Sequence, residues 1–275
     1  MSLQSFGFFG FLLVVAAIYL HLPQRWQSAF LLAASWVFYA LAMPSMLPVT
    51  IAIAVFTYLC GRGMTAREGA HKTAFLRIGV VGLLAILAFF KYNGAFASDG
   101  GWQAVAMPLG ISFYTFQCLS YTIDVYKRRC RVETNLLHYA LFVSFFPTLI
   151  NGPIERYPQM RPQIRKSRRF SYGRCAGGAF RMLWGYTKKM VLADNLSHYV
   201  SLVYGDVGSM SGPNLVAATV LFAVQLYMDF SGCCDIALGA ARILGYDLIE
   251  NFQSPFEART FNDFWRRWHI SLGSW

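Results

Sequence analysis

Long apolar runs separated by short polar breaks dominate the chain. Three stretches contain no Asp, Glu, Lys or Arg, namely residues 26–61, 100–123 and 207–228. Each supplies the roughly 20 residues that a helix needs to cross a bilayer. The pattern therefore predicts an all-α, polytopic integral membrane protein with multiple transmembrane helices.

Prolines and charged loops divide these runs into separate helices. The expected spans are Phe6–Leu22, Ala29–Met43, Met46–Cys60, Ile78–Tyr92, Val105–Ile123, a mixed stretch Phe180–Tyr204 and Pro213–Met228, with the apolar pattern continuing over Cys233–Leu248. A signal peptide is the alternative for the first run, but it lacks a basic start and a small-residue cleavage site. Because no repeat or linker is visible, residues 1–275 are expected to form a single membrane-embedded domain.

The distribution of basic residues predicts the orientation of the chain. Its net charge is +11, and the basic loop at residues 62–77 belongs in the cytoplasm by the positive-inside rule, which puts the N-terminus outside. Ten Lys and Arg residues lie between Asn151 and Met190, against the single acid Glu155. This cluster also suits anionic lipid headgroups or a phosphorylated acyl donor. We expect no nucleic-acid partner for so apolar a chain.

The run Leu136–Ile154 conflicts with that orientation, because a full crossing would place the basic cluster outside. Its breakers, Pro147 and the pair Gly152-Pro153, predict a re-entrant segment that enters the bilayer and returns to the same side. Irregular backbone at this depth needs shielding by protein or by a water-filled cavity, so we expect it to border a functional chamber. Two helices lying at the membrane surface are the alternative.

Two acids follow an uncharged run in the segment YMDFSGCCD. Ionisable groups at membrane depth are costly and often functional. At about 100° per residue, Asp229 and Asp235 lie roughly 120° apart around a helix, so they share a site only if Ser231-Gly232 breaks that helix. The structural alternative is that one acid partners a base such as Arg242.

The last residues, FNDFWRRWHISLGSW, concentrate aromatic side chains around one histidine. If Phe261–Leu272 is a helix with Thr260 or Asn262 at its N-cap, helical spacing puts Trp265, Trp268, His269 and Leu272 on one face. Apolar surroundings lower the pKa of an imidazole, which then serves as a general base near neutral pH. Arg266, one turn earlier, is a candidate for binding a phosphate or carboxylate. A hydrogen-bonded packing histidine is the alternative.

Six segments resemble one family in the expected order. They are FKYNGAF, PLGISFYTFQCLSYTIDVYKR, YALFVSFFPTLINGPIERY, KKMVLADNL, QLYMDFSGCCDIALGAARILGYDLIENF and the terminal ENFQSPFEARTFNDFWRRWHISLGSW. These segments resemble the membrane-bound O-acyltransferases, in the bacterial branch of alginate O-acetylation and teichoic acid D-alanylation. The resemblance covers the chain from about residue 90 onward, and the GPIERY and RRWHISL forms are closer to the alginate type.

The resemblance implies that His269 is the first of two characteristic histidines and the catalytic base. The second lies downstream in the family and has no counterpart before Trp275, so we expect an incomplete fold and no activity from 275 residues alone. The further residues expected to line the site are Arg266, Trp265, Trp268, Asn251, Asp229, Ser231, Asp235, Pro153 and Arg156.

The resemblance also implies the partners. We expect no bound cofactor or metal, and acetyl-CoA or another acyl thioester as the donor substrate from the cytoplasm. Besides membrane lipids, the expected partners are a periplasmic acetyltransferase and a polysaccharide acceptor, with the protein in the bacterial inner membrane. The alternatives are an inactive remnant of such an enzyme and a membrane transporter. The six cysteines lack CxxC spacing, and we expect them to be thiols of a packed interior.

Overall fold

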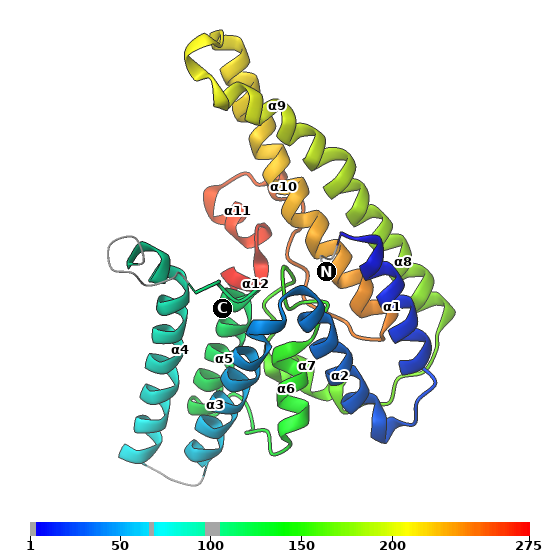
Figure 1. The fold of residues 1–275 in the computed structure, drawn as a ribbon, viewed down its shortest axis with the longest axis vertical. Helices are drawn as coiled ribbons and strands as arrows, with labels where there is room; N and C mark the ends of the chain where they lie inside the picture. Colours follow the sequence, from blue (N-terminus) through cyan, green and yellow to red (C-terminus); the bar gives the residue numbers. More distant parts are fainter. Residues whose placement is uncertain (1–3, 66–68, 97–104) are drawn as a thin grey trace.

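The fold is a computed structural model that describes residues 4–65, 69–96 and 105–275, and its regular elements are helices (Figure 1). Three helical stretches of the described chain are long and apolar enough to cross a membrane: Pro44–Thr65, Ala70–Gly94 and Gly212–Ile243. The helices are α1 (Phe6–Tyr19), α2 (Gln24–Ala42), α3 (Leu47–Thr65), α4 (Ala70–Phe96), α5 (Ile111–Tyr126), α6 (Leu136–Ser144), α7 (Tyr157–Ile164), α8 (Tyr172–Tyr186), a π-helix (Thr187–Ala193), α9 (Asp194–Gly205), α10 (Gly212–Ile243), α11 (Phe261–Arg267) and α12 (Ile270–Gly273). The predicted all-α architecture is confirmed.

Most of the predicted spans have different bounds in the structure, and two of the differences have clear local features. The run expected to begin at Val105 becomes helical only at Ile111, because Gly110 adopts a left-handed conformation with φ 73°. An added Cβ at Gly110 would lie 2.0 Å from the carbonyl oxygen of Leu149, so only glycine fits there. The apolar runs on either side of Ser231-Gly232 form one unbroken helix, α10, which spans 32 residues.

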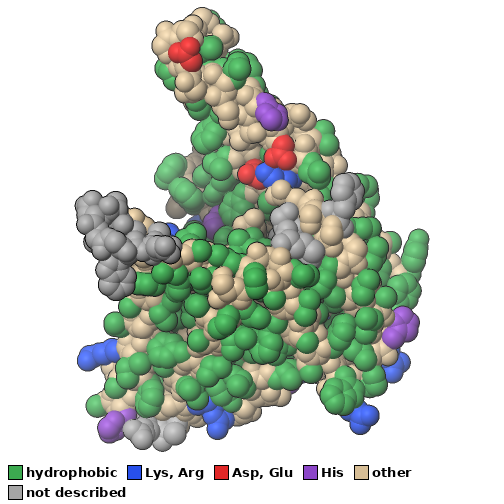
Figure 2. All heavy atoms as spheres, viewed as in Figure 1, with side chains coloured by type: hydrophobic (Ala, Val, Ile, Leu, Met, Phe, Trp, Pro, Cys, Tyr) green, Lys and Arg blue, Asp and Glu red, His purple; other side chains and the backbone are tan. Residues whose placement is uncertain are grey.

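Several basic loops meet at one end of the molecule. Lys72 Nζ donates to the carbonyl oxygen of Tyr126 at 2.8 Å, and Gln24 Nε2 donates to that of Arg165 at 3.0 Å. Figure 2 shows hydrophobic side chains over most of the visible face, with Lys and Arg gathered mainly along its lower edge. This arrangement is the one that the positive-inside rule requires of the cytoplasmic end.

Helices α6 and α7 form a hairpin with a buried turn at the segment predicted to be re-entrant. The chain leaves α6 at Phe145, turns through a buried segment in which Phe146 is 0% and Leu149 is 2% exposed, and returns to α7. The turn touches Gly110 at the start of α5. Since α5 has 16 residues and is roughly 24 Å long, the hairpin reaches most of the way along that helix. Its two ends lie together, where Glu133 pairs with Arg165.

A buried carboxylate holds the open end of this hairpin. Glu133, just before α6, forms ion pairs with Arg165 at 2.8 Å and Arg161 at 3.4 Å, and it accepts a hydrogen bond from the Tyr157 hydroxyl. Burial alone would raise the pKa of Glu133. The Tyr157 hydroxyl, the Asn135 N–H and Arg165 outweigh that effect and lower the pKa to about 2. Glu133 therefore stays ionised and fastens α7 to the start of α6.

Glycines let α8 and α10 approach backbone to backbone. A Cβ added at Gly185 would lie 2.7 Å from the carbonyl oxygen of Gly232, and one at Gly178 would lie 2.7 Å from that of Gly239. Both pairs fit an antiparallel crossing, because seven positions separate the two glycines on each helix. Small residues at such crossings are the usual means of packing helices in membranes.

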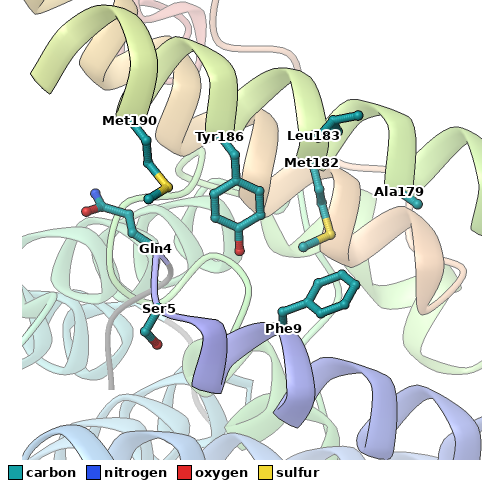
Figure 3. A pocket seen from close by; sticks show the side chains of 8 residues that line it. All are labelled: Gln4, Ser5, Phe9, Ala179, Met182, Leu183, Tyr186 and Met190. Atoms are coloured by element: carbon teal, nitrogen blue, oxygen red, sulfur yellow. The ribbon is translucent and has the colours of Figure 1, made fainter. Parts of the chain in front are cut away.

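An apolar groove lies between the start of α1 and α8, as Figure 3 shows. It encloses about 440 Å³ and is lined by Gln4, Ser5, Phe9, Ala179, Met182, Leu183, Tyr186 and Met190. This lining is mostly hydrocarbon, thioether and aromatic surface, without a charged side chain. The groove therefore offers no acid–base chemistry, and the candidate site lies elsewhere.

The hairpin topology predicts where loop residues become accessible. In a background without native cysteines, Ser167→Cys should be protected from a membrane-impermeant thiol reagent in intact cells and labelled after permeabilisation. Ser211→Cys, at the far end of the α9–α10 hairpin, serves as the control and should be labelled in intact cells. Labelling of Ser167→Cys from outside would contradict the re-entrant topology.

The glycine contacts predict a sharp position dependence of stability within α8. Gly185→Ala should lower the free energy of unfolding by about 1–3 kcal/mol, because backbone atoms of α10 must move to admit the methyl group. Gly173→Ala, in the same helix with open space around it, should be neutral or slightly stabilising, since alanine is the better helix former. Equilibrium unfolding in detergent measures both, and equal effects at the two positions would refute the close approach.

Candidate active site

His269 lies at a break between two short helices and not inside one. Helix α11 ends at Arg267, Trp268 is extended, and His269 is left-handed with φ 47° and ψ 52°, before α12 begins at Ile270. The predicted continuous helix over Phe261–Leu272 is therefore wrong. Its predicted start is right: Thr260 is the N-cap, and its hydroxyl accepts from the Asp263 N–H at 3.1 Å. A left-handed conformation at a non-glycine residue costs on the order of 1–3 kcal/mol and is typical of functional sites.

Pairing with a distant segment causes this break. Phe252 and Trp268 form an isolated antiparallel bridge, and the Gln253 N–H donates to the Arg267 carbonyl oxygen at 3.0 Å. The Ile270 N–H donates to the Asn251 carbonyl oxygen, also at 3.0 Å. These backbone bonds take the place of those a continuous helix would make, so the chain reverses at His269.

The Asn251 side chain holds the turn at His269 in place. Its side chain is 1% exposed; Oδ1 accepts from the Ser271 N–H at 3.1 Å, and Nδ2 contacts the Cys234 Sγ at 3.3 Å. The Ser271 hydroxyl in turn accepts from the Ile154 N–H at 3.1 Å. The histidine turn is thus tied to α10 through Cys234 and to the re-entrant hairpin through Ile154.

The His269 imidazole has one aromatic neighbour and an unused nitrogen. Its ring packs edge-to-face on Phe230 of α10, with 4.8 Å between the ring centroids. The Nε2 atom is buried and has no hydrogen-bond partner in the described part of the chain. Burial lowers the pKa of His269 below its ordinary value. Burial thus favours the neutral form of the imidazole, and one ring nitrogen lacks a partner among the described residues.

The predicted tryptophans do not both reach the imidazole. Trp268 packs on Phe252 with 5.1 Å between centroids and stacks on Phe264 at 5.5 Å, so it supports the turn. Trp265 packs on Phe264 and is 51% exposed. Arg266 lies in the last turn of α11 and is also exposed. Among the predicted aromatic and basic neighbours, only Trp268 therefore belongs to the framework of the histidine turn.

The two acids of α10 take separate basic partners from the neighbouring helix. Asp235 binds Lys188 Nζ at 2.7 Å and Arg181 at 2.9 Å, whereas Asp229 binds Lys189 Nζ at 2.8 Å. The predicted lack of a shared carboxylate site is confirmed, but the suggested partner Arg242 is wrong. The π-helix explains the pairing, because its wider turn lets two consecutive lysines face α10.

A small cavity lies among these groups. It encloses about 40 Å³ and is lined by Arg181, Lys188, Tyr227, Ser231, Cys234, Asp235, Leu238, Glu250, Asn251 and Phe252. The Ser231 hydroxyl is buried there without a partner in the described residues. The predicted residues Ser231, Asp235 and Asn251 thus meet at one polar cavity with room for ordered water. Asn251 connects this cavity to the histidine turn.

Arg156 and Pro153 belong to the hairpin side of the site. Arg156 donates to the Trp275 carbonyl oxygen at 3.0 Å and lies 3.5 Å from the Asp124 carboxylate. Pro153 is buried in the segment whose next residue, Ile154, binds Ser271. Arg156 therefore joins the hairpin to the residues that follow α12.

Sequence reasoning missed several residues around the histidine. Phe230, Ser271 and Ile154 carry no signal for their roles, because their contacts connect positions far apart in the chain. In the sequence, Glu155 stands out only as the single acid among ten basic residues. It is 2% exposed, its Oε1 accepts from the Ile249 N–H at 2.8 Å, and burial raises its pKa to about 7. It fastens the hairpin to the segment that leads into Asn251.

The chain is similar in sequence to several known proteins. The chain is 35% identical over 281 residues to the "Probable alginate O-acetylase AlgI" of Pseudomonas syringae pv. tomato, covering 97% of this chain and 54% of that protein. It is 34% identical over 302 residues to the "Peptidoglycan O-acetyltransferase" of Helicobacter pylori, covering 97% and 56%. The "Teichoic acid D-alanyltransferase" of Bacillus subtilis is 27% identical over 173 residues, covering 61% and 43%.

These comparisons confirm the resemblance seen in the sequence and favour the O-acetylating branch over the D-alanylating one. The chain spans about half the length of the curated relatives it matches. The sequence model of the membrane-bound O-acyltransferase family matches residues 84–275, which include the hairpin, α10 and the histidine turn. This chain belongs to the membrane-bound O-acyltransferase family.

Proposed function

We propose that this chain carries the general base of a membrane O-acyltransferase that moves an acyl group from a thioester toward hydroxyls of an envelope polysaccharide. The observation that carries the proposal is His269, a left-handed residue whose buried Nε2 has no partner in the described chain. A packing histidine would use its ring nitrogens to satisfy nearby groups. Here the surrounding bonds hold the backbone and leave the imidazole nitrogen free.

The chemistry follows from the neutral state of the imidazole. Its free nitrogen accepts the proton of the acceptor hydroxyl as the oxygen attacks the thioester carbonyl carbon. The tetrahedral intermediate collapses with cleavage of the C–S bond, and the departing thiolate takes the proton back from the imidazolium. One ester forms, one thioester breaks, and His269 returns to its neutral form.

The surroundings of His269 suit this role by fixing the base and excluding water. Asn251 and Ser271 hold the turn, and Phe230 covers one side of the ring. Correct positioning of reacting groups supplies up to roughly 7–11 kcal/mol of a barrier. We assign Asn251, Ser271, Pro153 and Arg156 to positioning, and the ion pairs of Asp229 and Asp235 to the wall of the chamber.

The substrates of the whole protein are proposed from its relatives. Acetyl-CoA or another acyl thioester serves as the donor from the cytoplasmic end, where the basic loops gather. The acceptor is a polysaccharide hydroxyl, reached through a periplasmic acetyltransferase partner, and the protein resides in the bacterial inner membrane. The relatives' names, which include alginate O-acetylase and peptidoglycan O-acetyltransferase, support acetyl transfer over transport.

Replacing the base tests the proposal directly. In a strain that carries the substitution at the chromosomal locus, His269→Ala should lower polysaccharide acetylation by about 10²–10⁴-fold per molecule of membrane protein, the usual contribution of a general base. His198→Ala, which changes an exposed histidine on α9, is the matched control and should leave acetylation unchanged. Full acetylation with His269→Ala would remove this residue from the mechanism.

Loosening the turn should slow the chemistry without removing the base. Ser271→Ala deprives the Ile154 N–H of its acceptor, and we expect kcat to fall roughly 10–100-fold while KM for the thioester changes little, since the base is misplaced. Steady-state kinetics on purified enzyme measures both constants, with Ser197→Ala as the control for loss of a serine hydroxyl. A lower yield of folded protein with an unaltered kcat would mean that Ser271 is only structural.

A further inference from the structure

A second polar pocket opens at the basic end of the molecule. It encloses about 550 Å³ and is lined by Pro23, Gln24, Arg25, Ser28, Asn135, Leu137, His138, Ile164 and Arg165. Its walls come from the α1–α2 turn and from both open ends of the re-entrant hairpin (Figure 1). The His269 turn is held by residues near the turn of the hairpin and by α10, whereas this pocket lies at the hairpin's open end. The pocket is therefore separate from the candidate active site.

The pocket carries surplus positive charge. Arg165 and Arg161 share one fully buried acid, Glu133, so the buried group neutralises only one of two guanidinium charges. Arg25 is exposed, and no acid within the described residues pairs with it; its guanidinium lies 6.0 Å from the ring centroid of Trp26. The Glu133 cluster therefore keeps one net positive charge beside the pocket, and Arg25 adds a second charge from the α2 side.

A helix terminus and a histidine line the same pocket. Helix α2 begins at Gln24 after Pro23, and no side chain of the described residues caps its first N–H groups. Such an end of a 19-residue helix carries partial positive charge and free donors, which suit a phosphate. The His138 ring forms part of the hairpin wall. Cationic side chains and a helix terminus thus converge on one pocket.

We propose that this pocket binds the phosphate of an anionic ligand, and that an anionic phospholipid headgroup is the form that fits it. Trp26, next to Arg25, is 56% exposed, and amphipathic rings of this kind favour the headgroup layer. Arginine recognises phosphate through paired, charge-assisted hydrogen bonds. The bound lipid joins the α1–α2 turn to both ends of the hairpin. This role requires no acyl transfer and goes beyond the proposed function.

Binding to the purified chain in detergent micelles tests the proposal. Native mass spectrometry counts bound phosphatidylglycerol, with a galactolipid that lacks phosphate as the control ligand, and a parallel titration uses inorganic phosphate. Arg25→Gln should weaken phosphatidylglycerol binding about tenfold or more, as expected for loss of a charge-assisted contact. Arg129→Gln, an exposed arginine in the α5–α6 loop outside the pocket, should leave binding unchanged.

The arms of the experiment separate the sources of the phosphate. Binding of phosphatidylglycerol but not of inorganic phosphate identifies a lipid site, whereas binding of both identifies a site for any accessible phosphate group. Thermal unfolding without ligand shows that each variant is folded, and Arg25 is exposed enough to be replaced without disturbing packing. Equal binding by Arg25→Gln, Arg129→Gln and the unaltered chain, or equal binding of the galactolipid, would overturn the proposal.

Discussion

The backbone that breaks between α6 and α7 lies deep in a membrane protein, where lipid offers no hydrogen-bond partners. Its polar groups must be satisfied within the fold. The Ile154 N–H reaches the Ser271 hydroxyl, and the Glu155 carboxylate accepts from the Ile249 N–H. The need to shield the hairpin thus brings two segments that follow α10 against it. The same contacts place the histidine turn beside the hairpin.

A second constraint acts at the opposite end of the hairpin. Glu133 is fully buried with two arginines and a tyrosine, and a buried charge without such partners would be strongly unfavourable. Its network keeps the hairpin's ends together while the closed side supports the active-site turn. The hairpin is therefore held by ion pairs at its open end and by hydrogen bonds near its turn. Aromatic side chains pack between these two regions.

The sequence predicted the parts of this structure that depend on local signals. The conflict between basic loops and apolar runs, with Pro147 and Pro153 as breakers, predicted the hairpin, and the Thr260 N-cap predicted where α11 begins. The helical spacing of the apolar residues wrongly predicted a continuous helix through His269. The bridge between Phe252 and Trp268 joins segments that are separate in the sequence, and it overrides this helical pattern. The contact between Phe230 and His269 could not be predicted either, because the sequence of α10 does not indicate which face of this helix meets the imidazole.

The π-helix limits how the chain can vary in length. Its extra residue lets Lys188 and Lys189 both face α10, while Gly185 is locked against Gly232 on one side and Val200 and Val203 of α9 are buried on the other. Deleting one residue from Thr187–Ala193 would restore an ordinary α-helical turn with α9 in nearly the same orientation, because a π-helical turn holds about one residue more than an α-helical turn. The buried valines would keep their contacts, but Lys188 and Lys189 could no longer both face α10. The length of this segment is therefore tied to the two ion pairs with Asp229 and Asp235.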